Sequence, residues 1–192
     1  MSAATLEIVH GSVPRVGEIA NGDAVVVRHF DGGALVAVID ALGHGPKAAD
    51  VADLAASMLA AVPLDAGSRG VLGIFDLVHD ALRGSRGAAA MICVVEQDRI
   101  EGCGVGNVEL RCAGVSLPVV LSPGILGVGK VRMRPFAGRL NPGCRLYMFS
   151  DGISRRAPFT ELARLSGDEA CRELLDRYRR NHDDASVLVL SA

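Results

Sequence analysis

Tryptophan is absent from this chain of 192 residues, and aromatic side chains make up only 4% of it. A chain of this length can bury a sizeable core, which must here be built mainly from aliphatic side chains, since hydrophobic residues reach 49% in all. A charge excess is also lacking, because 20 Lys and Arg stand against 22 Asp and Glu. Without a basic surplus to meet phosphate backbones, we expect no binding to nucleic acid.

Long apolar runs are missing as well. The most apolar stretch, residues 34–39, is stopped by Asp40, and the first 20 residues lack the cationic start and apolar block of a signal peptide. The five cysteines are odd in number and form no CxxC pair: Cys93, Cys103, Cys112, Cys144 and Cys171. We therefore expect a cytoplasmic protein with reduced thiols, no membrane association and no structural zinc site.

The pattern of turns and apolar runs predicts segregated strands and helices. Strands are expected at 25–30 and 34–39, joined by Asp31-Gly32-Gly33 as a hairpin. Helices are expected at 47–61, 68–82 and 166–180. Further strands are expected at 88–95, 100–105, 108–112 and 115–121, as an antiparallel meander, and at 131–136, 145–149 and 185–190. Because strands and helices do not alternate, the sequence predicts an α+β fold with antiparallel sheets and outer helices, in one domain spanning 1–192.

Acidic residues stand at the ends of four of these strands, next to small residues. Asp23 opens the first strand in Gly22-Asp23, and Asp40 ends the second in Asp40-Ala41-Leu42-Gly43-His44-Gly45. Asp151 follows a later strand in Ser150-Asp151-Gly152, and Asp183-Asp184-Ala185-Ser186 leads into the last one. Strand ends are stiff supports, and neighbouring glycines let ligands approach closely.

Carboxylates that converge from several strand ends would repel one another unless cations neutralised them. Oxygen ligands without a His/Cys pattern favour Mg²⁺ or Mn²⁺, and two such ions could activate a water for attack on phosphorus. The alternative is that each Asp beside Gly is a turn or helix-cap residue. The sequence alone does not show that the four positions converge.

These four motifs, in this order, resemble the type 2C (PPM) metal-dependent Ser/Thr protein phosphatases. The resemblance runs from about residue 20 to the C-terminus and is strongest to the SpoIIE-like bacterial branch, in particular to the minimal RsbX-type stressosome phosphatases. It implies an antiparallel β-sandwich flanked by antiparallel helix pairs, with two divalent metals, Mn²⁺ or Mg²⁺, at one end.

The resemblance also implies roles for individual residues. Asp40 would bridge both metals, with the Ala41 carbonyl and Asp23 on the same metal, so that Asp40 and Asp23 are the catalytic pair. Asp151 and Asp183 would hold the other metal. Asp184 stands where many relatives have Asn, and a supporting role is implied for it.

Three positions depart from the family pattern, and one family residue has no clear counterpart. Ala41 replaces a commoner Gly, and Ser186 replaces Thr but keeps the hydroxyl. His44 does not have the spacing of the general-acid His found outside this branch, which leaves a structural or solvated His as the alternative. The phosphate-binding Arg of eukaryotic relatives has no clear counterpart, although Arg15 and Lys47 are candidates or else ordinary surface charges.

The resemblance implies a phosphoserine or phosphothreonine protein phosphatase that acts, as a monomer, on STAS-domain stressosome or sigma-factor regulators. Metal-activated water would attack directly, without a phosphoenzyme. A first alternative is a catalytically weak phosphoprotein-binding regulator of the same fold. A second is an unrelated regulator with structural Ca²⁺, but the chain has no Asp-x-Asp-x-Asp-Gly loop.

Overall fold

The computed structural model describes residues 6–64 and 70–192, which form two antiparallel sheets with helices outside them. The five-stranded sheet has the order β2-β3-β4-β5-β7, and the four-stranded sheet has the order β1-β9-β8-β6. The strands are β1 (Glu7–Val13), β2 (Asp23–Phe30), β3 (Gly33–Ala41), β4 (Ala88–Glu96), β5 (Arg99–Val105), β6 (Glu109–Ala113), β7 (Phe136–Arg139), β8 (Arg145–Phe149) and β9 (Ala185–Ser191).

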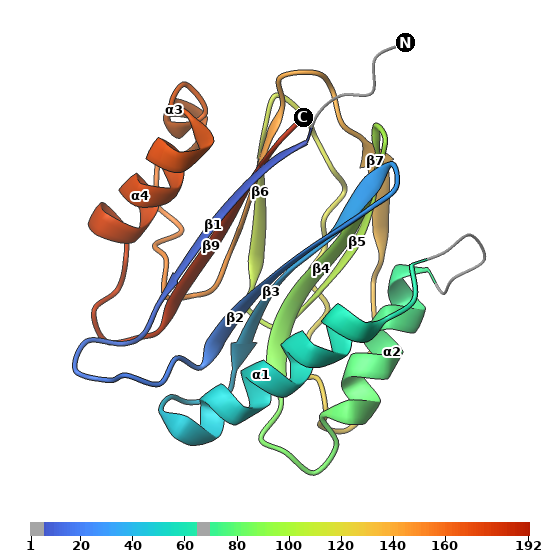
Figure 1. Ribbon diagram of the computed structural model, residues 1–192, viewed down its shortest axis with the longest axis vertical. Helices are drawn as coiled ribbons and strands as arrows, with labels where there is room; N and C mark the ends of the chain where they lie inside the picture. The colour runs from blue at the N-terminus through green and yellow to red at the C-terminus, as the bar shows by residue number, and fades with distance from the viewer. Residues whose placement is uncertain (1–5, 65–69) are drawn as a thin grey trace.

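Two pairs of helices cover the outer faces of the sheets (Figure 1). In the first pair, α1 (Pro46–Ala61) packs on β2 and β3, and α2 (Val71–Ala81) packs on β4 and β5. In the second pair, α3 (Phe159–Leu162) contacts β6, and α4 (Gly167–Arg177) packs on β1 and β9. The arrangement is therefore a sandwich of four layers.

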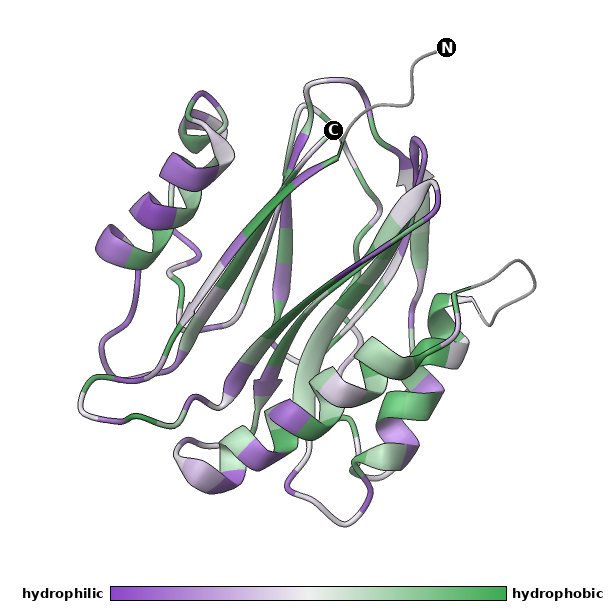
Figure 2. Cartoon of the chain, in the orientation of Figure 1, coloured by the Kyte–Doolittle hydropathy of each residue, from purple (hydrophilic) through white to green (hydrophobic). Residues whose placement is uncertain are grey.

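Side-chain alternation along the strands divides the core into three apolar clusters. In β3, Ala34, Val36 and Val38 face the other sheet, whereas Leu35, Ala37 and Ile39 face α1 and α2. β9 follows the same rule, with Leu188 and Leu190 between the sheets and Val187 and Val189 under α3 and α4. Strands with both faces buried read as continuous apolar runs, and Figure 2 shows β3 and β4 largely in the hydrophobic colour.

The fold confirms the predicted α+β class and the antiparallel sandwich with outer helices, and it corrects several predicted elements. No strand forms at 115–121, where Pro118 lacks the N–H that a ladder needs. The side chains there still alternate, and Val115, Leu117, Val119 and Leu121 pack on the core between the sheets. The expected strand at 131–136 begins only at Phe136, directly after Pro135.

The predicted meander is also divided between the sheets. β4 and β5 pair in the five-stranded sheet, but β6 pairs with β8 in the other one. The helix predicted over 68–82 is Val71–Ala81, with 68 and 69 outside the described residues. β1 and α3 were not predicted from the sequence. Within the described ranges, no helix combines the length and the hydropathy needed to cross a membrane.

Candidate active site

The four acidic strand ends lie at the same end of the sandwich. Asp23 and Asp40 are direct cross-strand partners in the β2–β3 ladder. Asp151 follows β8 and Asp183 precedes β9, and these two strands are antiparallel neighbours. In Figure 1, the arrowhead of β3, the loop between β1 and β2 and the beginning of α1 all lie at the lower end. One carboxylate pair therefore comes from each sheet.

Buried hydroxyl groups join the two sheets at this end. Ser150 Oγ, directly after β8, donates to Asp23 Oδ2 at 2.6 Å. Ser150 Oγ also accepts a hydrogen bond from the backbone N–H of Ser186 at 3.0 Å. In return, the Ser150 N–H donates to the Ser186 carbonyl at 3.1 Å. Ser12 Oγ lies 2.5 Å from Ser186 Oγ. Because both Ser150 and Ser186 are fully buried, Asp23 is oriented by fixed donors of the opposite sheet.

Two further side chains orient the aspartates. Asn107 Nδ2 donates to Asp151 Oδ2 at 2.7 Å. Asp184 accepts backbone N–H groups with both oxygens, from Arg15 at 2.7 Å and from Gly22 at 2.9 Å. The sequence did not indicate a role for Asn107, because its Gly106-Asn107 pair has the composition of an ordinary turn. Ser150 and Ser186 belong to the motifs found in the sequence, but the sequence did not indicate that their hydroxyls hydrogen-bond to Asp23.

Burial and mutual repulsion raise the pKa values of these carboxyl groups. Desolvation raises the pKa of Asp40 to about 8, and the charges of Asp23, Asp151 and Asp183 contribute to the rise. Burial likewise raises the pKa of Asp23 to about 7, against the hydrogen bonds from Ser150 and Ser186, which lower it. The pKa of Asp183 is raised by its burial and by Asp151. The carboxyl groups of both sheets therefore lie within one another's electrostatic field.

The donor set has the chemistry of a site for hard cations. Within the described ranges, no three His, Cys, Asp or Glu side chains are already arranged around a common point as metal ligands. Buried carboxylates that repel one another are nevertheless stabilised when a divalent cation enters, and oxygen donors suit Mg²⁺ and Mn²⁺. Ala41, whose carbonyl was the other expected ligand, is buried beside Asp40 with its N–H on the Gly22 carbonyl at 2.9 Å.

A glycine keeps the turn after Asp151 tight. A Cβ on Gly152 would lie 1.8 Å from the Asp184 carbonyl oxygen, so any larger residue would force the two chain segments apart. The Ser150-Asp151-Gly152 motif thus places Asp151 beside the segment that carries Asp183.

The expected phosphate-binding candidates and His44 lie around the same end. His44 Nδ1 is 2.5 Å from Glu18 Oε1, so His44 joins the loop after β3 to the loop between β1 and β2. Arg15 contributes its backbone N–H to Asp184, and Lys47 is exposed in the first turn of α1. Arg86, which the sequence analysis did not consider, donates from Nη1 to the Leu42 carbonyl at 2.9 Å.

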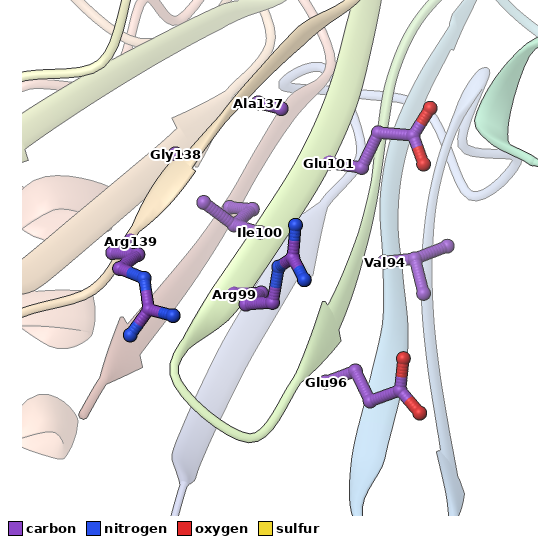
Figure 3. Close-up of a pocket in the computed structure, with 8 residues that line it drawn as sticks. All are labelled: Val94, Glu96, Arg99, Ile100, Glu101, Ala137, Gly138 and Arg139. Carbon is purple, nitrogen blue, oxygen red and sulfur yellow. The ribbon is translucent and has the colours of Figure 1, made fainter.

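A hollow of about 500 Å³ lies elsewhere, on β4, β5 and β7 (Figure 3). It reaches Glu96 at the far end of β4, whereas Asp40 pairs with Ala89 near the start of that strand. Its charged lining consists of two glutamates and two arginines, Glu96, Glu101, Arg99 and Arg139. It contains none of the four aspartates, and its mixed charge does not make a metal site.

A cysteine nucleophile is excluded by burial. Two cysteines have the spacing of a Cys-x₅-Arg phosphatase loop, Cys93 with Arg99 and Cys171 with Arg177. Cys93 lies inside β4, is fully buried, and has its thiol pKa raised far above the usual range by desolvation. Cys171 lies inside α4, is also buried, and has its thiol pKa raised to about 11 by desolvation. A thiol that stays protonated is a poor nucleophile.

Comparison with known proteins identifies the family. Residues 31–192 match the model of the family described as Stage II sporulation protein E (SpoIIE). One solved structure is 36% identical to this chain, with a TM-score of 0.86 over 97% of this chain and 99% of that one. It is described under the bacterial stressosome, a modular system that has been adapted to control secondary messenger signalling. Comparison with curated protein sequences gives no match.

Two more distant structures share the fold. RsbX, solved in complex with magnesium, is 19% identical, with a TM-score of 0.80 over 99% of this chain and 96% of that one. The catalytic domain of the Ser/Thr protein phosphatase PstP, solved with two manganese ions, is 16% identical, with a TM-score of 0.73 over 97% of each chain. Because the family model covers most of the chain, the chain belongs to the family described as Stage II sporulation protein E (SpoIIE).

Proposed function

We propose that this chain hydrolyses phosphoserine or phosphothreonine on STAS-domain proteins of a stressosome or sigma-factor switch. The observation that carries the catalytic part is the Asp23–Asp40 cross-strand pair, which lies in the electrostatic field of Asp151 and Asp183 from the other sheet. The substrate class is supported by the 36% identical relative from the bacterial stressosome and by the fold shared with RsbX. The proposed unit is one domain over residues 1–192, acting as a monomer.

The proposed ligands of two divalent cations, Mn²⁺ or Mg²⁺, are Asp40, Asp23 and the Ala41 carbonyl on one side and Asp151 and Asp183 on the other. When bound, the cations supply the positive charge that ionises a water at neutral pH and offsets the charge of the phosphate. Asp40 would hold a cation close to the opposing pair, since the charges of Asp23, Asp151 and Asp183 all contribute to the raised pKa of its carboxyl group.

The chain's own residues do the positioning. Ser150 holds the Asp23 carboxylate by its Oδ2, so that the other oxygen of that group stays available to a cation. Asn107 does the same for Asp151. The fixed donors reduce the reorganisation needed when the charged site assembles.

The proposal is tested by phosphate release from p-nitrophenyl phosphate and from a phosphorylated STAS protein, with Mn²⁺, with Mg²⁺ and with chelator. We expect cation-dependent turnover of both substrates in the wild type and its loss in Asp40→Asn. Asp98→Asn serves as a matched control, because Asp98 is a surface partner of Arg139 outside the aspartate cluster. Cation binding without turnover of either substrate would favour the phosphoprotein-binding regulator, and turnover of p-nitrophenyl phosphate alone would reject the STAS substrate.

A further inference from the structure

Large apolar side chains are exposed on the loop between β1 and β2. Ile19 is 99% exposed and Val16 is 61% exposed. Burial of a branched aliphatic side chain away from water is favourable, so each of these exposed side chains can stabilise a contact with another surface. Both side chains stand on one short loop, where another surface can cover them.

This loop is tied to the fold at several points. Arg15 to Glu18 form a turn closed by a Glu18 N–H to Arg15 carbonyl hydrogen bond of 3.0 Å, with Gly17 at φ +90 where such a turn requires a positive φ. Asp184 fixes both ends through the N–H groups of Arg15 and Gly22. Because the backbone is already ordered, covering Ile19 costs little additional conformational entropy.

The loop borders the aspartate cluster. Glu18, next to Ile19, contacts His44 at 2.5 Å, and His44 belongs to the segment that follows Asp40. The same segment exposes Leu42, whose backbone is held by its N–H on the Gly87 carbonyl at 3.0 Å and by the Arg86 guanidinium on its own carbonyl at 2.9 Å. Val16, Ile19 and Leu42 therefore stand on two anchored loops beside Asp23 and Asp40.

Depth and charge indicate what approaches this surface. Asp23 is buried and Asp40 is only partly exposed. A phosphate group that reacts there must therefore enter between the surrounding loops to reach the strand ends. Phosphoserine has a short side chain, and the protein surface that carries it must then touch the surrounding loops. Arg86 adds a positive charge beside Leu42, which suits an incoming phosphate dianion.

We propose that Val16, Ile19 and Leu42 form a docking surface for the folded phosphoprotein substrate, which covers them with an apolar patch next to its phosphorylated Ser or Thr. This inference rests on the proposed phosphatase function and adds where its protein specificity resides. Ile19 is the central contact because it is the most exposed of the three.

The test separates docking from chemistry by using two substrates of different size. For Ile19→Asp we expect kcat/KM on a phosphorylated STAS protein to fall about 10- to 100-fold, mostly through KM, as loss of one apolar anchor implies. The rate on p-nitrophenyl phosphate, which is too small to reach Ile19, is expected to change less than about twofold. Leu54→Ser is the matched control, since Leu54 is 42% exposed on α1, about 12 Å along the helix from its first turn.

Each other outcome overturns the inference. An equal fall on both substrates would place Ile19 in the support of the aspartates instead of in docking. An unchanged KM on the phosphoprotein would leave the patch without this role. Dissociation of a dimer by Ile19→Asp, seen by light scattering, would assign the surface to a second copy of the chain. Failure of the proposed function itself is recognised separately, because the wild type would then turn over neither substrate.

Discussion

At the scale of single residues, the site depends on neutral side chains as much as on aspartates. Asp23 is a buried carboxyl group whose pKa, about 7, would be higher still without the hydrogen bonds from Ser150 and Ser186. Both hydroxyls belong to the opposite sheet, so the ionisation of Asp23 depends on how closely the sheets approach each other. A hydroxyl in either motif therefore has a function that does not require it to touch the substrate.

Ser150→Ala is expected to weaken cation binding. Removal of a hydrogen bond to a charged group costs about 1.5–3 kcal/mol, and every 1.4 kcal/mol corresponds to tenfold in affinity. We expect the Mn²⁺ concentration for half-maximal phosphatase activity to rise about tenfold or more. Ser12→Ala is the control, because Ser12 contacts Ser186 but lies one step further from Asp23, and a change below about threefold is expected. Equal effects of the two substitutions would contradict the role assigned to Ser150.

At the scale of elements, the sequence predicted the parts whose signal is local. The predicted strands at 25–30 and 34–39 and the predicted helix at 47–61 are visible in periodicity and turn residues. Their ends differ by at most two residues from β2, β3 and α1 of the structure. Residues 115–121 have the alternation of a strand, but alternation reports which side chains are buried and not whether a backbone partner exists. β1 is half-exposed along its length and therefore carries only a weak apolar signal.

The candidate site, like the fold, was predictable only in those features that depend on a short stretch of sequence. Each aspartate could be placed at a strand end, because strand ends are local. That Asp23 pairs with Asp40 follows from a hairpin and is also local. The contact of Ser150 with Asp23, 127 positions apart, depends on the packing of the two sheets, which no pattern within one segment encodes.

The turn between β8 and the following segment offers a test at this scale. Gly152→Ala is expected to destabilise the fold by about 3 kcal/mol, because the new methyl would overlap the Asp184 carbonyl and the backbone must shift. Gly167→Ala is the matched control, since its methyl would meet only side-chain atoms, Val9 Cγ2 at 3.2 Å and the Glu7 carboxylate at 3.5 Å, in a helix where Ala is favoured. Urea unfolding measures both variants, and equal stability of the two would show that the turn can relax.

At the scale of the whole molecule, the aspartate cluster opposes closure of the sandwich unless protons or cations neutralise it. Two of the aspartates belong to the five-stranded sheet and two adjoin the four-stranded one, so their repulsion acts across the interface between the sheets. A bound cation would replace this repulsion between carboxylates with attraction of both pairs to the cation, and it would connect the sheets. Cation binding and folding stability are then linked through the same residues.

The linkage predicts how stability depends on pH without cations. Carboxyl groups titrate at about 3.9 in unfolded chains, whereas Asp23 and Asp40 have pKa values of about 7 and about 8 in the fold. Between these limits the native state binds more protons than the unfolded state, so the free energy of unfolding in chelator should fall as pH rises from about 4 to about 8. Urea unfolding at pH 5.5 and pH 8.5 measures the fall, and Asp40→Asn should reduce it.

At a Mn²⁺ concentration 100-fold above its dissociation constant, the wild type should regain about 2.7 kcal/mol of unfolding free energy at pH 8.5. It should regain less at pH 5.5, where protons compete for the carboxylates. A free energy of unfolding in chelator that rises with pH over this range would mean that the aspartates do not repel one another across the sandwich.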